Sequence, residues 1–248
     1  MDTSLCIICR TPNDVWVKFL NGFTNYTDIC IVVDDNEIDY VDMYKEYTRV
    51  KIIQIPNQAC LDAGFKNLVK VTIPKEVTAW EKALYYFSFV NTNYKNVWFL
   101  EDDVFFFDEN TLLNLDLKYI DDDLITSSSC FGDHTSTWCW TPVLEINLPN
   151  PIYHCMCCVA RMSKRMVDEV KLYACVNGTL TFLEALFPTM CRLKEFVHTM
   201  PYQLQNCIPP EVCEIKIEHF NNSTDHLWHP IKNMETHQLF RSLLQNLG

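Results

Sequence analysis

Four apolar runs, each followed by a polar turn, constrain the fold of this chain more than any other feature of its sequence. The runs lie at 5–9, 28–33, 50–55 and 96–100. None of them alternates polar and apolar residues, which favours strands that are covered on both faces, as in a parallel sheet. Helical patterns occur at 39–47, 74–90 and 109–115. The succession predicts right-handed crossovers and an α/β fold with an open, doubly wound, mostly parallel central sheet flanked by helices.

The second half of the chain is less regular. Residues 127–142 are polar and aromatic, and Trp138 and Trp140 would lie on one face of a strand there. We expect a short strand at 213–217 and helices at 163–174, 181–193 and 234–247, with Ser163 as an N-cap. No repeat or low-complexity linker divides the sequence, so we interpret residues 1–248 as a single domain.

Glycine is scarce: the chain has 5 in its 248 residues, and the closest pair is Gly22 and Gly64. Neither glycine-rich phosphate loop, GxGxxG or GxxxxGK[ST], is present. A bound nucleotide would therefore need a metal ion or side chains to neutralise its phosphates. The net charge of −12 argues against a nucleic acid or an anionic membrane as partner.

The 13 cysteines include two zinc-like spacings, Cys6-x-x-Cys9 and Cys155-x-Cys157-Cys158. Neither has the Gly or Pro turn residues of a zinc knuckle, so buried thiols are favoured over structural zinc. Unpatterned thiols are typical of a reducing compartment. Because no signal peptide and no membrane-spanning run is visible, we expect a soluble, cytoplasmic protein.

Acidic side chains follow two of the expected strands, at Asp34-Asp35 and at Glu101-Asp102-Asp103. In an open parallel sheet the ligand crevice lies at the carboxyl ends of the strands. Carboxylates gathered there repel one another unless a cation shares them, and Mg²⁺ or Mn²⁺ prefers such oxygen ligands. The alternative is that these acids are solvated strand ends. That alternative is weaker for 101–103, since the triplet interrupts a long apolar run.

Four segments, taken in order, resemble the GT-A-fold glycosyltransferases. Residues 98–105 (WFLEDDVF) resemble the acidic, metal-binding DxD motif, although the triplet here is Glu-Asp-Asp. The strand that ends in Asp34-Asp35 resembles the family's second strand. Residues 182–189 (FLEALFPT) resemble the acceptor-side helix of inverting members, and 228–232 (WHPIK) resemble the late His motif. Small members without anchors occur in large DNA viruses and bacteria, so a viral member would work in the host cytoplasm.

The resemblance implies transfer of a sugar from a nucleotide sugar, with UDP expected, to a glycan or glycoprotein acceptor. It implies a nucleotide-sugar-binding half at about 1–105 and an acceptor-binding half at about 106–248. Asp103 and His229 would hold Mn²⁺ or Mg²⁺, and Glu184 would be the general base of an inverting transfer, with Asp133 or Asp225 as the alternative base. The nucleotide-sugar candidates are Arg10, Thr11, Asp34, Asp35, Lys82, Glu101, Asp102 and Lys232. The acceptor candidates are the aromatic residues Trp138, Trp140, Tyr153 and Trp228.

Two other functions remain open from the sequence. A Mg²⁺-dependent nucleotidyltransferase could use a similar sheet, but that class usually has a Gly-rich basic loop after the first strand, and 10–13 (RTPN) has no glycine. A catalytically inactive nucleotide-sugar-binding module could also keep the fold. The presence of Asp103, Glu184 and His229 argues against that alternative.

Overall fold

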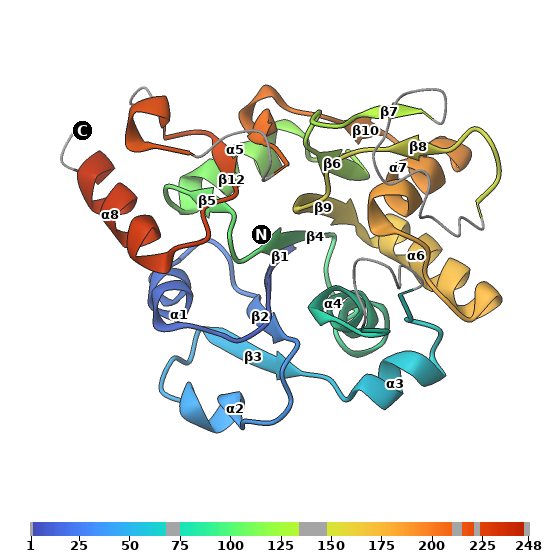
Figure 1. The fold of residues 1–248 in the computed structure, drawn as a ribbon, viewed down its shortest axis with the longest axis horizontal. Coiled ribbons are helices and arrows are strands. Elements are labelled where there is room, and N and C mark those ends of the chain that lie inside the picture. The colour runs from blue at the N-terminus through green and yellow to red at the C-terminus, as the bar shows by residue number, and fades with distance from the viewer. Residues whose placement is uncertain (1, 68–74, 134–147, 210–214, 221–223, 246–248) are drawn as a thin grey trace.

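The computed structural model describes residues 2–67, 75–133, 148–209, 215–220 and 224–245. A seven-stranded sheet with the order β10-β6-β9-β4-β1-β2-β3 runs through the middle of the molecule (Figure 1). Its strands are β1 (Thr3–Cys9), β2 (Ile29–Val33), β3 (Val50–Gln54), β4 (Asn96–Glu101), β6 (Leu124–Thr126), β9 (Val159–Ser163) and β10 (His198–Thr199). Two small sheets add β5 (Phe105–Phe106), β11 (Asn206–Cys207) and β12 (Leu227–His229), and β7 (Gly132–Asp133) with β8 (Tyr153–His154).

The predicted fold class is confirmed. The four apolar runs form β1, β2, β3 and β4, and these strands are parallel to one another in the order β3-β2-β1-β4. The sheet is mostly rather than fully parallel, because β9 runs antiparallel to both of its neighbours. The chain leaves β1 toward β2 and β3 and later returns to its other side as β4. The order in which strands are added to the sheet therefore reverses between β1 and β4, which are themselves parallel. This switch point leaves a crevice outside the carboxyl ends of the two strands.

Helices cover both faces of the sheet (Figure 1). The helices are α1 (Asp14–Asn21), α2 (Tyr40–Met43), α3 (Asn57–Asp62), α4 (Ala79–Tyr85), α5 (Glu109–Lys118), α6 (Lys164–Asn177), α7 (Leu183–Leu193) and α8 (Met234–Gln245). Alternate residues of β1 belong to two separate cores. Cys6 and Ile8 join a core shared with α3, α4, α6 and α7, whereas Leu5 and Ile7 join one shared with α1, α2 and α5. This double burial explains why the strands are apolar without alternation.

Several predicted boundaries differ from the structure. The 39–47 pattern forms only the short α2, and α4 begins at Ala79 because Thr78 caps it with its side chain. Ser163 caps α6, as expected. The strand expected around Trp138 and Trp140 lies outside the described residues. Of the strand expected at 213–217, residues 215–217 are described and form no strand, since Ile217 begins a 3₁₀ turn.

Pairing with the small sheet brings two distant segments together. β5, just after the acidic triplet, pairs antiparallel with β12, which carries His229 at its end. The register places Trp228 opposite Phe105. In addition, the Ile231 amide donates a hydrogen bond to the Asp103 carbonyl at 2.7 Å. The acidic turn at the end of β4 and the 227–231 segment are therefore held side by side.

Among the described residues, no helix combines the length and the apolar character that crossing a bilayer requires.

Candidate active site

Glu101, Asp103 and His229 form a group at the carboxyl end of β4. One ligand atom from each lies within 4.8 Å of the others. The His229 Nε2 is 3.3 Å from the Asp103 Oδ1 and 3.9 Å from the Glu101 Oε2. The His229 Nδ1 lies 2.8 Å from the Ile208 carbonyl, which can only accept, so Nδ1 carries the proton and Nε2 is the atom that faces the acids.

The electrostatics of this group fit a divalent cation. Burial, followed by the charge of Asp103, raises the pKa of Glu101 and raises that of Asp102 to about 6. The Asp103 Oδ1 is buried, and its contact with His229 does not satisfy it as a hydrogen bond. Burial alone would lower the pKa of His229, but Asp103 and Cys158 together raise it to about 11. Crowded, under-satisfied carboxylates with one imidazole are a donor set for Mn²⁺ or Mg²⁺.

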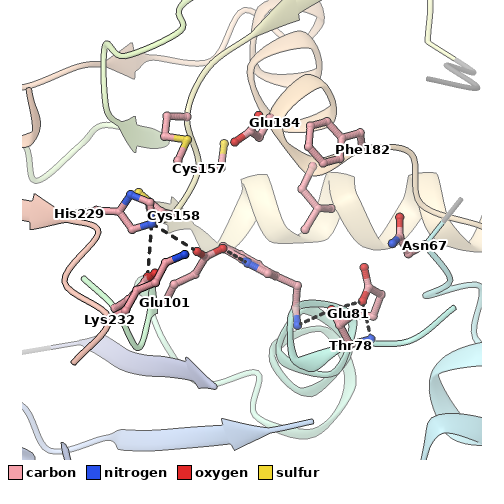
Figure 2. A pocket seen from close by; sticks show the side chains of 14 residues that line it. Asn67, Thr78, Glu81, Glu101, Cys157, Cys158, Phe182, Glu184, His229 and Lys232 are labelled. Carbon is pink, nitrogen blue, oxygen red and sulfur yellow. Dashed lines mark hydrogen bonds and ion pairs between the residues drawn. The ribbon is translucent and has the colours of Figure 1, made fainter. Parts of the chain in front are cut away.

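A cavity of ≈ 290 Å³ opens beside this group (Figure 2). Its lining comes from the carboxyl ends of β4 and β12, from the residues just before β9, and from the starts of α4 and α7. It is lined by Asn67, Thr78, Trp80, Glu81, Glu101, Asp103, Met156, Cys157, Cys158, Phe182, Leu183, Glu184, His229 and Lys232.

Glu184 lies in the first turn of α7, within this cavity. Burial, and then the charge of Glu101, raises the pKa of Glu184 to about 8. The Cys157 backbone partly offsets this rise in pKa, and in Figure 2 Cys157 lies beside the carboxyl group. A half-buried carboxyl group with a pKa near neutrality can take up or release a proton at working pH.

A second cavity of ≈ 240 Å³ lies across the acidic turn, at the ends of β1 and β2. It is lined by Ile8, Cys9, Arg10, Asp34, Thr78, Ala79, Trp80, Glu101, Asp102 and Asp103. Glu101 and Asp103 line both cavities, so the candidate metal group stands at their boundary.

The structure separates the two acids of the Asp34-Asp35 pair. Asp34 faces the second cavity and pairs with Lys75 at 2.6 Å. The Asp35 carboxylate instead accepts hydrogen bonds from the Tyr40 hydroxyl and the Glu37 amide, both at 2.8 Å. Lys82 is fully buried and lines neither cavity, because its ammonium donates to the carbonyls of Val33 and Asp34 at the end of β2.

The remaining candidates fall into three groups. Arg10 lines the second cavity and Lys232 the first, while Thr11 is exposed and lines neither. Trp228 is buried and its ring stacks on Phe220 at 4.4 Å, so it belongs to a core. Tyr153 lies in β8, away from both cavities, and Trp138 and Trp140 lie outside the described residues. The alternative bases Asp133 and Asp225 line neither cavity.

Several lining residues were not predicted as site residues. Trp80, in the first turn of α4, donates its Nε1 to the Glu101 Oε1 at 2.8 Å and thereby orients that carboxylate. Cys157 and Cys158 line the cavity together with His229. Burial raises the pKa of both thiols well above its usual value. Cys157 and Cys158 are both free thiols.

No protein-family model and no curated protein matches the sequence. Solved structures do match. A 4-diphosphocytidyl-2C-methyl-D-erythritol synthase from Anaerococcus prevotii DSM 20548 aligns with a TM-score of 0.51 at 7% identity, over 98% of this chain and 97% of that one. Mouse xyloside xylosyltransferase 1 in its apo form aligns with a TM-score of 0.49 at 10% identity, over 94% and 99%. The mannosyltransferase Ktr4p from S. cerevisiae aligns with a TM-score of 0.37 at 14% identity, over 71% and 60%.

The similarity to the synthase shows a shared α/β fold over nearly the whole of both chains. Identities this low show no more than the fold. Any function must therefore be argued from the site.

Proposed function

We propose that this protein is a metal-dependent glycosyltransferase that moves a sugar from a UDP-sugar to a hydroxyl group of a glycan or glycoprotein. The observation that carries the proposal is the position of the Glu101–Asp103–His229 group. It lies at the boundary between one cavity that is open toward Asp34 and Arg10 and another that contains Glu184. Such a boundary is where the leaving diphosphate and the attacking hydroxyl of a sugar transfer would meet.

Charge explains why the donor would need a cation. The second cavity is lined by four carboxylates, those of Asp34, Glu101, Asp102 and Asp103, and by one cationic residue, Arg10. A diphosphate placed there would face net repulsion. Mn²⁺ or Mg²⁺ held by Asp103 and His229, with Glu101 in support, would act as a Lewis acid toward the leaving diphosphate. Lys232, on the wall of the other cavity, would add a positive charge.

On the acceptor side, Glu184 would take the proton of the attacking hydroxyl group. Its raised pKa suits that task, because a base is most effective when its pKa is near the working pH. A base on one face of the sugar and a leaving group on the other correspond to a single displacement, which inverts the anomeric configuration.

Asp34 is the better candidate for recognising the nucleoside. A carboxylate can only accept hydrogen bonds, so it favours the N–H of a uracil-type base or a ribose hydroxyl. Asp35 already accepts two hydrogen bonds within its own turn. If GDP bound far more tightly than UDP in a calorimetric titration, the UDP assignment would be wrong.

The test of the whole proposal is a thermal-shift titration with nucleoside diphosphates, with and without Mn²⁺. We expect UDP to raise the Tm only when Mn²⁺ is present, because a ligand that binds the folded state stabilises it by mass action. Asp103→Asn should abolish the Mn²⁺-dependent shift. Asp62→Asn is the control, since Asp62 is exposed in α3 and lines neither cavity, and it should keep the Mn²⁺-dependent shift. An Asp103→Asn variant with undiminished Mn²⁺ dependence would overturn the assignment.

Nucleotidyl transfer is the second candidate, and the observation that favours it is the fold shared with a synthase of a diphosphocytidyl compound. Product analysis separates the two reactions. A glycosyltransferase releases UDP from a UDP-sugar, whereas a nucleotidyltransferase releases pyrophosphate from a nucleoside triphosphate and a sugar phosphate. Failure of both assays despite Mn²⁺-dependent UDP binding would instead indicate a binding module.

A further inference from the structure

Two side chains, one from each of two helices outside the cavities, hydrogen-bond the backbone in and beside the acidic turn. Trp16 of α1 donates its indole N–H to the Asp102 carbonyl at 2.8 Å. His237 of α8 has its Nε2 2.7 Å from the Ile231 carbonyl, and Ile231 in turn donates its amide to the Asp103 carbonyl at 2.7 Å. Because the Ile231 carbonyl can only accept, His237 carries its proton on Nε2.

The two side chains also contact one another. The Trp16 and His237 rings are 5.6 Å apart, and Trp16 is 1% and His237 0% exposed. Phe105, just beyond the acidic turn, packs on the other side of His237 at 5.6 Å. Burial, and then the charge of Arg241, lowers the pKa of His237 to about 4, so the ring is neutral. Neither Trp16 nor His237 is among the residues that line the two cavities of the candidate site.

We propose that Trp16 and His237 are positioning residues of the metal centre. Through Asp102 and Ile231 they fix the two backbone segments that present Asp103 and His229, and so they set the separation of these ligands. The inference rests on the metal-dependent part of the proposed function. Partners of this kind matter because a metal site binds well only when its ligands are already at coordination distance.

The test measures Mn²⁺ affinity directly, by electron paramagnetic resonance of free Mn²⁺ in titrations of the full, metal-free chain. Trp16→Phe keeps an aromatic ring and removes the donor to Asp102, and His237→Leu removes the donor to Ile231. Each should weaken Mn²⁺ binding about 10–100-fold, the usual cost of losing an outer partner of a metal ligand. His237→Gln places an amide N–H near the position of Nε2 and should restore most of the affinity.

Trp98→Phe is the matched control. Trp98 is a fully buried tryptophan whose Nε1 donates to Asp116, away from the metal group. It should lower the Tm of the metal-free chain about as much as Trp16→Phe and leave Mn²⁺ affinity unchanged. The Tm of every metal-free variant is recorded, so loss of fold is separated from loss of affinity. If His237→Leu does not fold, Trp16→Phe decides the test.

The outcomes separate the two proposals. If the wild-type chain binds Mn²⁺ and Trp16→Phe weakens binding no more than Trp98→Phe does, the positioning role is refuted and the proposed function stands. A His237→Gln variant as weak as His237→Leu would refute the hydrogen-bonding role of His237. A wild-type chain that does not bind Mn²⁺ overturns the metal-dependent function, and this inference with it.

Discussion

Glu184 is the residue on which the proposed chemistry depends most. Among the carboxyl groups that line the first cavity, that of Glu184 belongs neither to the metal group nor to the α4 cap. Glu184→Gln keeps the shape and removes the proton acceptor, so kcat should fall by roughly 10²–10⁴ while the Kd of the donor is unchanged. Asp133→Asn and Asp225→Asn are the controls, and both should keep near wild-type turnover. A product that retains the anomeric configuration of the donor would exclude this role.

The same residue predicts a pH dependence. The pKa of Glu184 is raised to about 8, chiefly by burial and then by the charge of Glu101, so the carboxylate needed for base catalysis accumulates as pH rises toward that value. We expect kcat to rise through the neutral range with a midpoint at or below about pH 8, and to level off about one pH unit above that midpoint. A cation beside Glu101 would offset its charge and move the midpoint downward. The profile is measured at saturating donor and acceptor; a kcat that falls as pH rises from 6 to 8 would contradict the base assignment.

Among the elements, the start of α4 is shared by both cavities. Thr78 caps the helix. The Glu81 carboxylate accepts hydrogen bonds from the Thr78 amide at 2.7 Å and from the Thr78 hydroxyl at 2.6 Å. Trp80, in the first turn, orients Glu101. Thr78→Ala should cost about 1 kcal/mol of unfolding free energy, measured by chemical denaturation, and should also weaken donor binding because Trp80 is less well held.

Asp108→Ala provides the matched comparison for that cap. Asp108 caps α5 by accepting from the Asn110 and Thr111 amides at 2.9 and 3.3 Å, and it lines neither cavity. The two variants should lose similar stability, and only Thr78→Ala should raise the donor Kd in a calorimetric titration. Equal donor affinities would show that the α4 cap is purely structural.

The elements also show what the sequence could and could not predict. β1, β2 and β4 were predictable because each is a mostly apolar run that is buried on both faces. β3 was predictable from its isoleucines, although its Lys51 is exposed. β9 was missed because Arg161 interrupts its pattern, and that arginine is fully buried against Asp116 at 2.7 Å. β5, β11 and β12 are two or three residues long and exist through long-range pairing, which local patterns do not encode.

The site residues also divide into those that the sequence could predict and those that it could not. The acidic triplet was predictable because charged residues inside an apolar run need a reason. That His229 would approach Asp103 rested on a resemblance, since only the β5–β12 pairing brings the two segments together. Met156 gave no signal, because an apolar residue that lines a cavity looks the same in sequence as an apolar residue in a core.

At the scale of the whole molecule, the negative charge of the chain extends into its cavities. The first cavity contains four carboxyl groups, on Glu81, Glu101, Asp103 and Glu184, against the cationic candidates His229 and Lys232. A divalent cation would offset the negative charge of Glu101 and Asp103, and the Glu81 carboxylate already accepts a hydrogen bond from Thr78. Glu184 would then be the uncompensated acid nearest the transferred sugar, which predicts that the donor sugar is uncharged.

UDP-glucose and UDP-glucuronate test this prediction, because they differ only in the carboxylate of the sugar. Like charges placed together in a binding site cost up to several kcal/mol, so the glucuronate should bind at least about tenfold more weakly in the presence of Mn²⁺. At about pH 9, above the pKa of about 8, the Glu184 carboxyl group is ionised. Under that condition Glu184→Gln removes the repelling charge and should narrow the difference, whereas UDP without a sugar should bind the wild type and the variant equally. The Kd values come from competition titrations at fixed ionic strength, since salt screens the effect. Equal affinity of the wild type for the two sugars would mean that Glu184 does not face the sugar. The acid beside the reacting centre would then have to be sought elsewhere.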